Sequence, residues 1–277
     1  MTVETRKFET IKVEKEDGIT WLYFNRPEKR NAMSPTLTRE MWEALDALDG
    51  DFETKVLVLT GAGDKSWSAG MDIREAFRER QGRQDRGEEK RRGAPPSWHD
   101  LLLNFSAPTI AMVNGYCFGG AFTPLYCCDI AIAAEDATFG VSEVNWGVIP
   151  GGLVSKVLAD MMSYRKAMYY IMTGDPFDGK QAEEMGVVTK AVPRDKLKEE
   201  TVKMAHVLME KNPNVLRACR EAFKAVVNMD HSQARAYLSA QSIALRYGDP
   251  SQGQAKGMSE FLDKKTYRPG FGTYRQD

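Results

Sequence analysis

The order of apolar and polar residues predicts a chain that begins with strands and ends with helices. Residues 9–15 alternate apolar and polar side chains, which is typical of a half-buried strand, and residues 19–25 predict the returning strand of a hairpin. Asp17-Gly18 between them is a turn signal. Residues 55–60 form a continuous apolar run, which indicates a buried strand in a parallel sheet.

Helical spacing follows in several places. Ser34-Pro35 is a helix-start signal, and the apolar residues over 38–48 recur at helical spacing. The other predicted helices cover residues 71–80, 98–105, 120–127, 153–170, 182–185 and 197–211, and two more core strands cover residues 109–113 and 130–134. From Pro213 the chain is predicted to be all-helical, with a stop near Pro269-Gly270. The prediction is therefore an α/β core over residues 1–195 and a helical C-terminal region over residues 196–277, with no internal repeat in the sequence.

Residues 78–97 differ in composition from the rest. Arg, Glu, Gln, Gly and Lys dominate there, and the segment ends in Pro95-Pro96. Two interpretations stay open: a solvated segment that orders over a ligand, or a plain exposed helix and loop. A second Gly/Pro loop is predicted over residues 147–152.

Composition narrows the classes of function. A formal charge of -1 gives no reason to expect nucleic acid or anionic lipid as the main partner. The most apolar stretch, residues 108–113, is too short to span a bilayer, and the polar start of the chain is unlike a secretory signal. We therefore expect a cytoplasmic protein. The four cysteines are expected to be buried, reduced thiols, and none of the three histidines has a partner at metal-ligand spacing, so no metal site is expected.

Candidate chemistry lies in two glycine-containing turns and one carboxylate. Phe118-Gly119-Gly120 precedes a predicted helix, so the Gly120 amide is a free donor there. Met71 is expected to open another helix and to offer a second free amide. Two such donors can stabilise an oxyanion, and Glu143 among apolar residues is expected to have a raised pKa suited to acid/base chemistry. Alone, each turn is also compatible with an ordinary strand-to-helix turn, and an isolated glutamate is more often a structural cap or ion-pair partner.

A basic turn follows the first hairpin. Three cations, Arg26, Lys29 and Arg30, lie within five residues and beside a proline. Such a turn can grip phosphates, and a solvated basic turn is the plainer alternative.

Taken together in order and spacing, these segments resemble the crotonase (enoyl-CoA hydratase/isomerase) superfamily over nearly the whole chain. The resemblance implies an α/β fold with a spiral core of ββα units and a helical C-terminal trimerisation region. It implies an oxyanion hole made by the Met71 and Gly120 amides, with Glu143 as the acid/base. Residues implied to line the CoA and thioester channel are Lys29, Arg30, Ala32, Ala69, Ile73 and Ser142.

One position narrows the resemblance further. Ordinary members of the superfamily carry a second glutamate where this chain has Thr123. The subgroup that tolerates this loss is the hydroxycinnamoyl-CoA (feruloyl-CoA) hydratase/lyases, and stretches such as 143–147 and 169–174 resemble it closely.

The aryl-binding positions match that subgroup only in part. Trp146 and Gly151 are kept, and Thr123 also falls in the implied substrate pocket. The two tyrosines that hold the ring hydroxyl in the subgroup are Ala76 and Ser239 here. The candidate replacements are Tyr116, Tyr237 and Tyr247.

The resemblance implies hydration of an aryl-substituted enoyl-CoA, followed by retro-aldol cleavage to an aromatic aldehyde and acetyl-CoA. It implies no cofactor beyond the CoA of the substrate, and a homotrimer or a hexamer made of two trimers. Two alternatives stay open: a hydratase or dehydratase of another bulky acyl-CoA without C–C cleavage, and a CoA-binding scaffold without chemistry.

Overall fold

The N-terminal hairpin forms as predicted. The structure is a computed structural model that describes residues 7–85 and 97–265. Strands β1 (Ile11–Glu16) and β2 (Ile19–Phe24) pair antiparallel. Asp17 and Gly18 between them have φ of 51° and 82°, the left-handed geometry that a two-residue hairpin turn needs.

A six-stranded sheet forms the centre of the molecule, in the order β1-β2-β3-β5-β7-β10. From β2 onward its strands run parallel. All six residues of β3 (Val56–Gly61) are buried, so the parallel strand predicted from the apolar run is confirmed. The remaining strands are β5 (Thr109–Val113), β7 (Ile130–Ala134) and β10 (Lys190–Val192).

A smaller sheet, which the sequence pattern does not predict, lies beside the main one. Its strands are β4 (Ser66–Ser68), β6 (Tyr116–Phe118), β8 (Thr138–Gly140) and β9 (Phe177–Asp178), in that order. Strands of two or three residues are too short to show a two-residue period. Each of β3, β5 and β7 is followed by one of these short strands and then by a helical segment, which gives the spiral of ββα units.

The helices agree broadly with the predicted ranges. The first of them, α1 (Pro35–Leu48), is capped by the Ser34 side chain, which accepts from the Leu37 amide. The other α-helices are α2 (Ile73–Asp85), α3 (Trp98–Leu103), α4 (Phe122–Cys127), α5 (Val154–Met161), α6 (Tyr164–Thr173), α7 (Gly179–Glu184), α8 (Leu197–Met209), α9 (Pro213–Val226), α10 (His231–Gly248) and α11 (Gly253–Leu262). Short 3₁₀ turns are η2 (Pro27–Lys29), η3 (Gly119–Ala121), η4 (Glu143–Trp146) and η5 (Arg194–Lys196).

Two predicted helices need correction. The helix predicted over residues 153–170 is two helices, α5 and α6, because Met162 and Ser163 are extended and break the run. The helix expected to open at Met71 begins at Ile73 instead. Residues 78–85 belong to α2, and the rest of the proposed ligand-covering segment, 86–96, lies outside the described residues.

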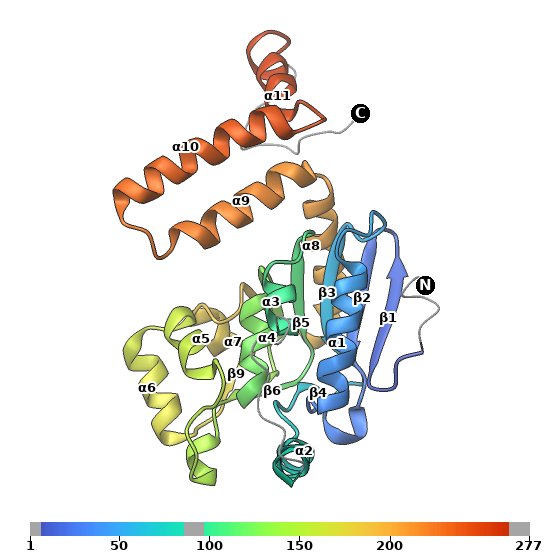
Figure 1. The fold of residues 1–277 in the computed structure, drawn as a ribbon, viewed down its shortest axis with the longest axis vertical. Coiled ribbons are helices and arrows are strands. Elements are labelled where there is room, and N and C mark those ends of the chain that lie inside the picture. Colours follow the sequence, from blue (N-terminus) through green and yellow to red (C-terminus); the bar gives the residue numbers. More distant parts are fainter. Residues whose placement is uncertain (1–6, 86–96, 266–277) are drawn as a thin grey trace.

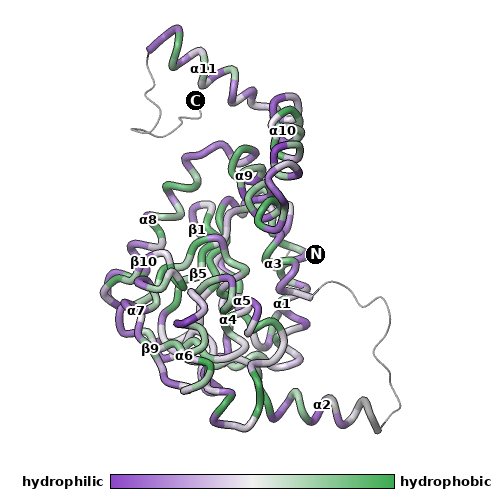
Figure 2. The backbone as a smooth tube through the Cα atoms, turned by 90° about the vertical axis from the view of Figure 1, so that its left-hand side faces the viewer, coloured by the Kyte–Doolittle hydropathy of each residue, from purple (hydrophilic) through white to green (hydrophobic). Residues whose placement is uncertain are grey.

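Within the helical C-terminal region, α8 packs on the main sheet and the helices after it stand clear of the sheets. Helix α8 packs against β3, β5 and β7, and α9, α10 and α11 extend beyond the core at one end of the molecule (Figure 1). Helix α9 is fastened by Arg220 and Lys224, which both pair with Asp129. The part that stands clear thus begins at α9, while the division at residue 195 stays a prediction. Helix α2 projects from the opposite end (Figure 2).

Two expectations about composition are tested by the fold. Cys117, Cys127 and Cys128 are buried free thiols as expected, but Cys219 on α9 is exposed. Within residues 7–85 and 97–265, every helix is too short or too polar to cross a membrane.

Candidate active site

Two backbone amides converge beside a pair of glycines. A Cβ built on Gly120 would lie 3.3 Å from the Met71 nitrogen, and one on Gly70 would lie 3.0 Å from the Gly120 nitrogen. Neither the Met71 nor the Gly120 amide donates to an acceptor anywhere in residues 7–85 and 97–265. The two donors therefore form a candidate oxyanion hole.

The Met71 amide is free for a different reason from the one expected. Met71 forms an isolated parallel bridge with Met33. Met33 donates to the Gly70 carbonyl at 2.7 Å and accepts from the Asp72 amide at 3.0 Å. Because successive amides of an extended chain point to opposite sides, the Met71 amide between these two bonds faces away from Met33 and toward Gly120.

The carboxylate of Glu143 lies against the same glycines. Gly119 has φ of +51°, and a Cβ there would be 2.8 Å from Glu143 Oε1. Glu143 Oε2 is buried and has no hydrogen-bond partner in the described part of the chain. Burial raises the pKa of Glu143 above its ordinary value of 4.5, and a hydrogen bond from its own amide offsets this only in part. The predicted direction of the shift is thus confirmed, although the neighbouring Trp146 is itself 72% exposed.

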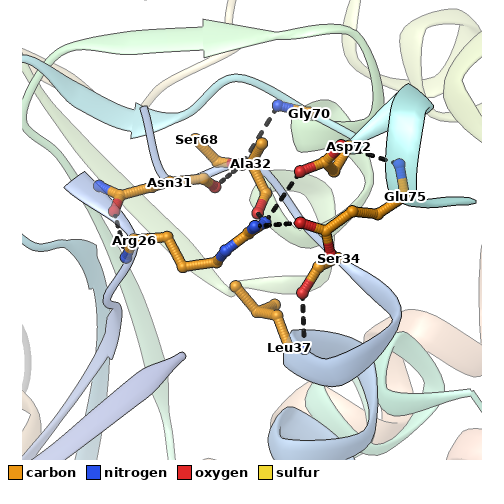
Figure 3. A network of polar contacts seen from close by, with 9 residues as sticks. All are labelled: Arg26, Asn31, Ala32, Ser34, Leu37, Ser68, Gly70, Asp72 and Glu75. Carbon is orange, nitrogen blue, oxygen red and sulfur yellow. Dashed lines mark hydrogen bonds and ion pairs between the residues drawn. The ribbon is translucent and has the colours of Figure 1, made fainter. Parts of the chain in front are cut away.

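The basic turn is built around a buried asparagine. Asn31 has φ of 55° and is completely buried. Its side chain accepts from the Arg26 amide at 2.9 Å (Figure 3). It also donates to the carbonyls of Ala62 and Ser66 at 3.0 and 2.7 Å. This fastens the turn to strand β4 and leaves Lys29 and Arg30 exposed to solvent.

Arg26 does not belong with the phosphate-gripping cations. Its side chain is 9% exposed and donates to Asp72 Oδ2 at 3.1 Å and to Glu75 Oε1 at 2.6 Å. It also donates to the Ala32 carbonyl at 2.7 Å (Figure 3). Only two of the three predicted cations therefore face solvent from this turn.

The other expected CoA-channel residues lie on the segments that carry the candidate oxyanion hole and Glu143. Ala69 donates to the Arg30 carbonyl at 2.9 Å, which joins the basic turn to the Met71 segment. Ile73 at the start of α2 is 68% exposed, and Ser142 directly precedes the turn that carries Glu143. Arg30 lies over the ring of Tyr116, with its guanidinium carbon 5.7 Å from the ring centre.

The expected aryl-pocket residues are only partly brought together. Thr123 is 5% exposed and lies one turn after Gly120 on the η3–α4 segment. Trp146 and Gly151 are exposed on the segment that follows Glu143. Ser239 lies on α10, and α10 lies at the opposite end of the molecule from α2 (Figure 1). Within one copy of the chain, Ser239 is therefore remote from this site.

Sequence reasoning missed the residues that support the site. Asn31 and Ser68 were not singled out, yet Ser68 Oγ donates to the Asn31 carbonyl at 2.9 Å and accepts from the Gly70 amide at 3.2 Å. A polar residue in a buried turn gives no chemical signal in a sequence, because its partners are backbone atoms from distant segments.

The two convergent amides can polarise a carbonyl, and the carboxylate of raised pKa beside them can move a proton near that carbonyl.

The model of the family described as "Enoyl-CoA hydratase/isomerase" matches residues 14–270, so the chain belongs to this family. Solved structures agree: an enoyl-CoA hydratase from Bacillus anthracis has a TM-score of 0.80 and 25% identity, with 92% of this chain and 97% of that chain covered.

Among individual proteins, the hydroxycinnamoyl-CoA hydratase-lyase of Pseudomonas fluorescens is 49% identical over 277 residues, which is the full length of both chains. The crotonyl-CoA hydratase of Syntrophomonas wolfei is 31% identical over 258 residues, 93% of this chain and 96% of that protein.

Proposed function

We propose that this chain is a hydroxycinnamoyl-CoA hydratase-lyase. It hydrates an aryl-substituted enoyl-CoA of the feruloyl or 4-coumaroyl type and then cleaves the product to an aromatic aldehyde and acetyl-CoA. The full-length relative with 49% identity supports the substrate class. The observation that carries the chemistry is the meeting of the Met71 amide, the Gly120 amide and the Glu143 carboxylate around Gly119-Gly120.

Hydration uses all three groups. The thioester oxygen accepts from both amides, so charge that reaches it through the conjugated double bond is stabilised as an oxyanion. Glu143 takes a proton from water, whose oxygen bonds to the β-carbon. Protonated Glu143 then gives that proton to the α-carbon, and the thioester carbonyl reforms. The raised pKa of Glu143 suits a group that must both accept and donate a proton near neutral pH.

The cleavage step uses the same groups in a second cycle. Glu143 takes the proton from the β-hydroxyl, the Cα–Cβ bond breaks, and the aryl aldehyde leaves. The electron pair of that bond forms the enolate of acetyl-CoA, whose oxygen sits on the same two amides. Glu143 returns the proton to the enolate carbon. Protons and electrons balance without a redox step, so the proposal requires no cofactor beyond the CoA of the substrate.

Substrate binding is assigned to the surroundings of these groups. Lys29 and Arg30 are the exposed cations available to the CoA phosphates, and Ala32, Ala69, Ile73 and Ser142 line the path to the thioester. Thr123, Trp146 and Gly151 bound the aryl side. We further propose that the protein is a homotrimer or a dimer of trimers, in which Ser239 on α10 reaches the site of a neighbouring copy.

The test is turnover of feruloyl-CoA and 4-coumaroyl-CoA, followed by loss of the enoyl-thioester absorbance and by release of aldehyde and acetyl-CoA. Equal amounts of aldehyde and acetyl-CoA are expected. Hydroxyacyl-CoA without acetyl-CoA would instead identify a hydratase that lacks C–C cleavage, and binding without any product would identify a scaffold.

A single substitution tests the acid/base assignment. Glu143→Gln keeps the shape of the side chain and removes its proton transfer, so kcat is expected to fall by at least about a hundredfold.

Native mass spectrometry of the same preparations should give three or six copies of the chain. A Glu143→Gln variant with near-normal kcat would contradict the mechanism, and a monomer would contradict the assembly.

A further inference from the structure

The oxyanion donor from Met71 rests on a thin backbone support. Upstream of Met71 the segment has further supports, because the Ala69 amide donates to the Arg30 carbonyl and the Gly70 amide donates to Ser68 Oγ. Downstream, the isolated bridge to Met33 ends with the bond from the Asp72 amide to the Met33 carbonyl. Directly after it the chain enters α2, which projects from the body of the molecule (Figure 2). That single bridge bond at the root of a projecting helix does not by itself fix the downstream side of the Met71 amide to the tolerance that an oxyanion hole needs.

One buried side chain joins both sides of this bridge. Arg26 donates through Nη1 to the Ala32 carbonyl, which directly precedes Met33, and to Asp72, which directly follows Met71. Through Nη2 it donates to Glu75 in the first turn of α2 (Figure 3). Asp72 in turn caps this helix, because its Oδ1 accepts from the Glu75 amide at 3.1 Å. The guanidinium therefore ties the Met33 side, the Met71 side and the start of α2 to a single rigid group.

The opposite wall of the donor pair depends on the same segment. Met33 Cε would lie 3.4 Å from a Cβ on Gly120, so the Met33 side chain packs against the second donor. A shift of Met33 relative to Asp72 would change the distance between the two amides.

We propose that Arg26 is a positioning residue for the oxyanion hole. Together with Asp72 and Glu75 it holds the Met71 amide in the direction of the substrate carbonyl, and it touches neither substrate nor the reacting atoms. This proposal rests on the function proposed above, since it assigns a support to the donor that function requires.

The two cations of the CoA turn have supports of their own, although the Arg26 guanidinium also bonds to Ala32 at the end of that turn. This gives the proposal a distinct kinetic signature. Lys29 and Arg30 are held by Asn31, which bonds to Ala62 and Ser66, and by the Arg30 carbonyl, which accepts from Ser66 Oγ at 2.8 Å. None of these bonds involves the Arg26 guanidinium. Loss of that group is therefore expected to lower kcat more than it raises KM.

The experiment compares Arg26→Gln with a matched control, Arg220→Gln. Arg220 is similarly buried, with 13% of its side chain exposed against 9% for Arg26. It likewise pairs with a carboxylate, Asp129, and donates to a backbone carbonyl, that of Phe105, but it lies on α9. Both variants should lose thermal stability. Only Arg26→Gln is expected to lower kcat, by about 10- to 100-fold, with KM within about threefold of the wild-type value.

A spectroscopic measurement separates positioning from general loosening. A bound enoyl-CoA with a ¹³C-labelled thioester carbonyl should show a lowered C=O stretching frequency in the wild-type protein. Arg26→Gln should bind the ligand and show a smaller shift, whereas Arg220→Gln should show the full shift. Asp72→Asn should reduce the shift as well, and the double variant Arg26→Gln/Asp72→Asn should do so by less than the sum of the two.

The outcomes distinguish the two proposals. If the wild-type protein leaves the carbonyl frequency unchanged, the proposed function itself fails. If the wild-type protein lowers the frequency and Arg26→Gln lowers it equally, the function stands and the positioning role of Arg26 is overturned. Parallel losses of kcat in Arg26→Gln and Arg220→Gln would overturn it too.

Discussion

The contact between Gly119 and Glu143 gives the sharpest test of how the backbone places the acid/base group. In Gly119→Ala, the new Cβ would lie 2.8 Å from Glu143 Oε1, where ordinary contact begins near 3.4 Å. The carboxylate must therefore retreat by about 0.6 Å, and it can do so because it is the free end of a flexible side chain. The backbone at φ of +51° adds a strain of about 1 kcal/mol for a residue with a Cβ.

These two costs affect different measurements. Strain of about 1 kcal/mol should lower Tm by roughly 3 °C in a chain of this size. Displacement of Glu143 should lower kcat by about 10- to 50-fold, given that a 1 Å misplacement costs about a hundredfold. Movement toward solvent should also lower the pKa of Glu143 toward its ordinary value, so the acid limb of kcat/KM should shift to lower pH.

Gly50→Ala is the matched control for this substitution. Gly50 also has a left-handed backbone, with φ of +82°, but a Cβ there meets nothing within 4 Å. It lies between α1 and β3, on no element that carries the candidate site. We expect the same small loss of Tm and an unchanged kcat. The reasoning is refuted if both variants keep wild-type kcat, or if Gly119→Ala changes KM alone.

Three further predictions follow from single residues. In the wild-type protein, kcat/KM should fall on the acid side at a pH above 4.5, because Glu143 must be ionised to act as a base and its pKa is raised. Glu143→Gln should abolish that acid limb. An acid limb at or below pH 4.5 in the wild-type protein would contradict the burial argument. Burial lowers the pKa of His99 from 6.5 to about 4. Between these pH values the unfolded chain binds more protons than the folded chain. The free energy of unfolding should therefore fall by up to about 3 kcal/mol as the pH drops through that range. Urea unfolding at pH 7.5 and 5.0 should show about 2 kcal/mol of this loss, because pH 5.0 lies 1.5 units below 6.5. His99→Phe should show less of it, and equal losses would refute the role of His99. Asn31→Ala removes the partner of two buried backbone groups and one partly buried one, which should cost about 3 kcal/mol in thermal or urea unfolding. It should also raise KM for acyl-CoA more than it lowers kcat, and the opposite kinetic split would contradict the support assigned to the basic turn.

The larger elements of the fold could be predicted because their signals are local. The hairpin follows from alternation on both sides of Asp17-Gly18, and β3 follows from a run of apolar residues that is buried throughout. The short strands of the second sheet have no such signal. Ser66–Ser68 is a strand only because β6 lies beside it, and that pairing joins residues about fifty positions apart.

The candidate site shows the same division. Glycines beside a carboxylate are visible in the sequence, and the structure brings Gly119, Gly120 and Glu143 together. The role of Arg26 was not visible, because its position in a basic turn suggested a phosphate ligand. Whether a cation faces solvent or a buried carboxylate depends on Asp72 and Glu75, which lie more than forty residues further along the chain.

The loss of the second carboxylate has a consequence for the one that remains. A glutamate at position 123 would lie one turn after Gly120, close to the Glu143 carboxylate beside Gly119, and two like charges so placed would drive one pKa upward. With Thr123 there, burial is the only cause in the described part of the chain that raises the pKa of Glu143, and no neighbouring charge contributes to the shift. Glu143 must then deliver the same proton that it removes. Such a group fits both halves of the proposed reaction, since hydration and cleavage each begin with the loss of a proton from oxygen and end with its return to the α-carbon.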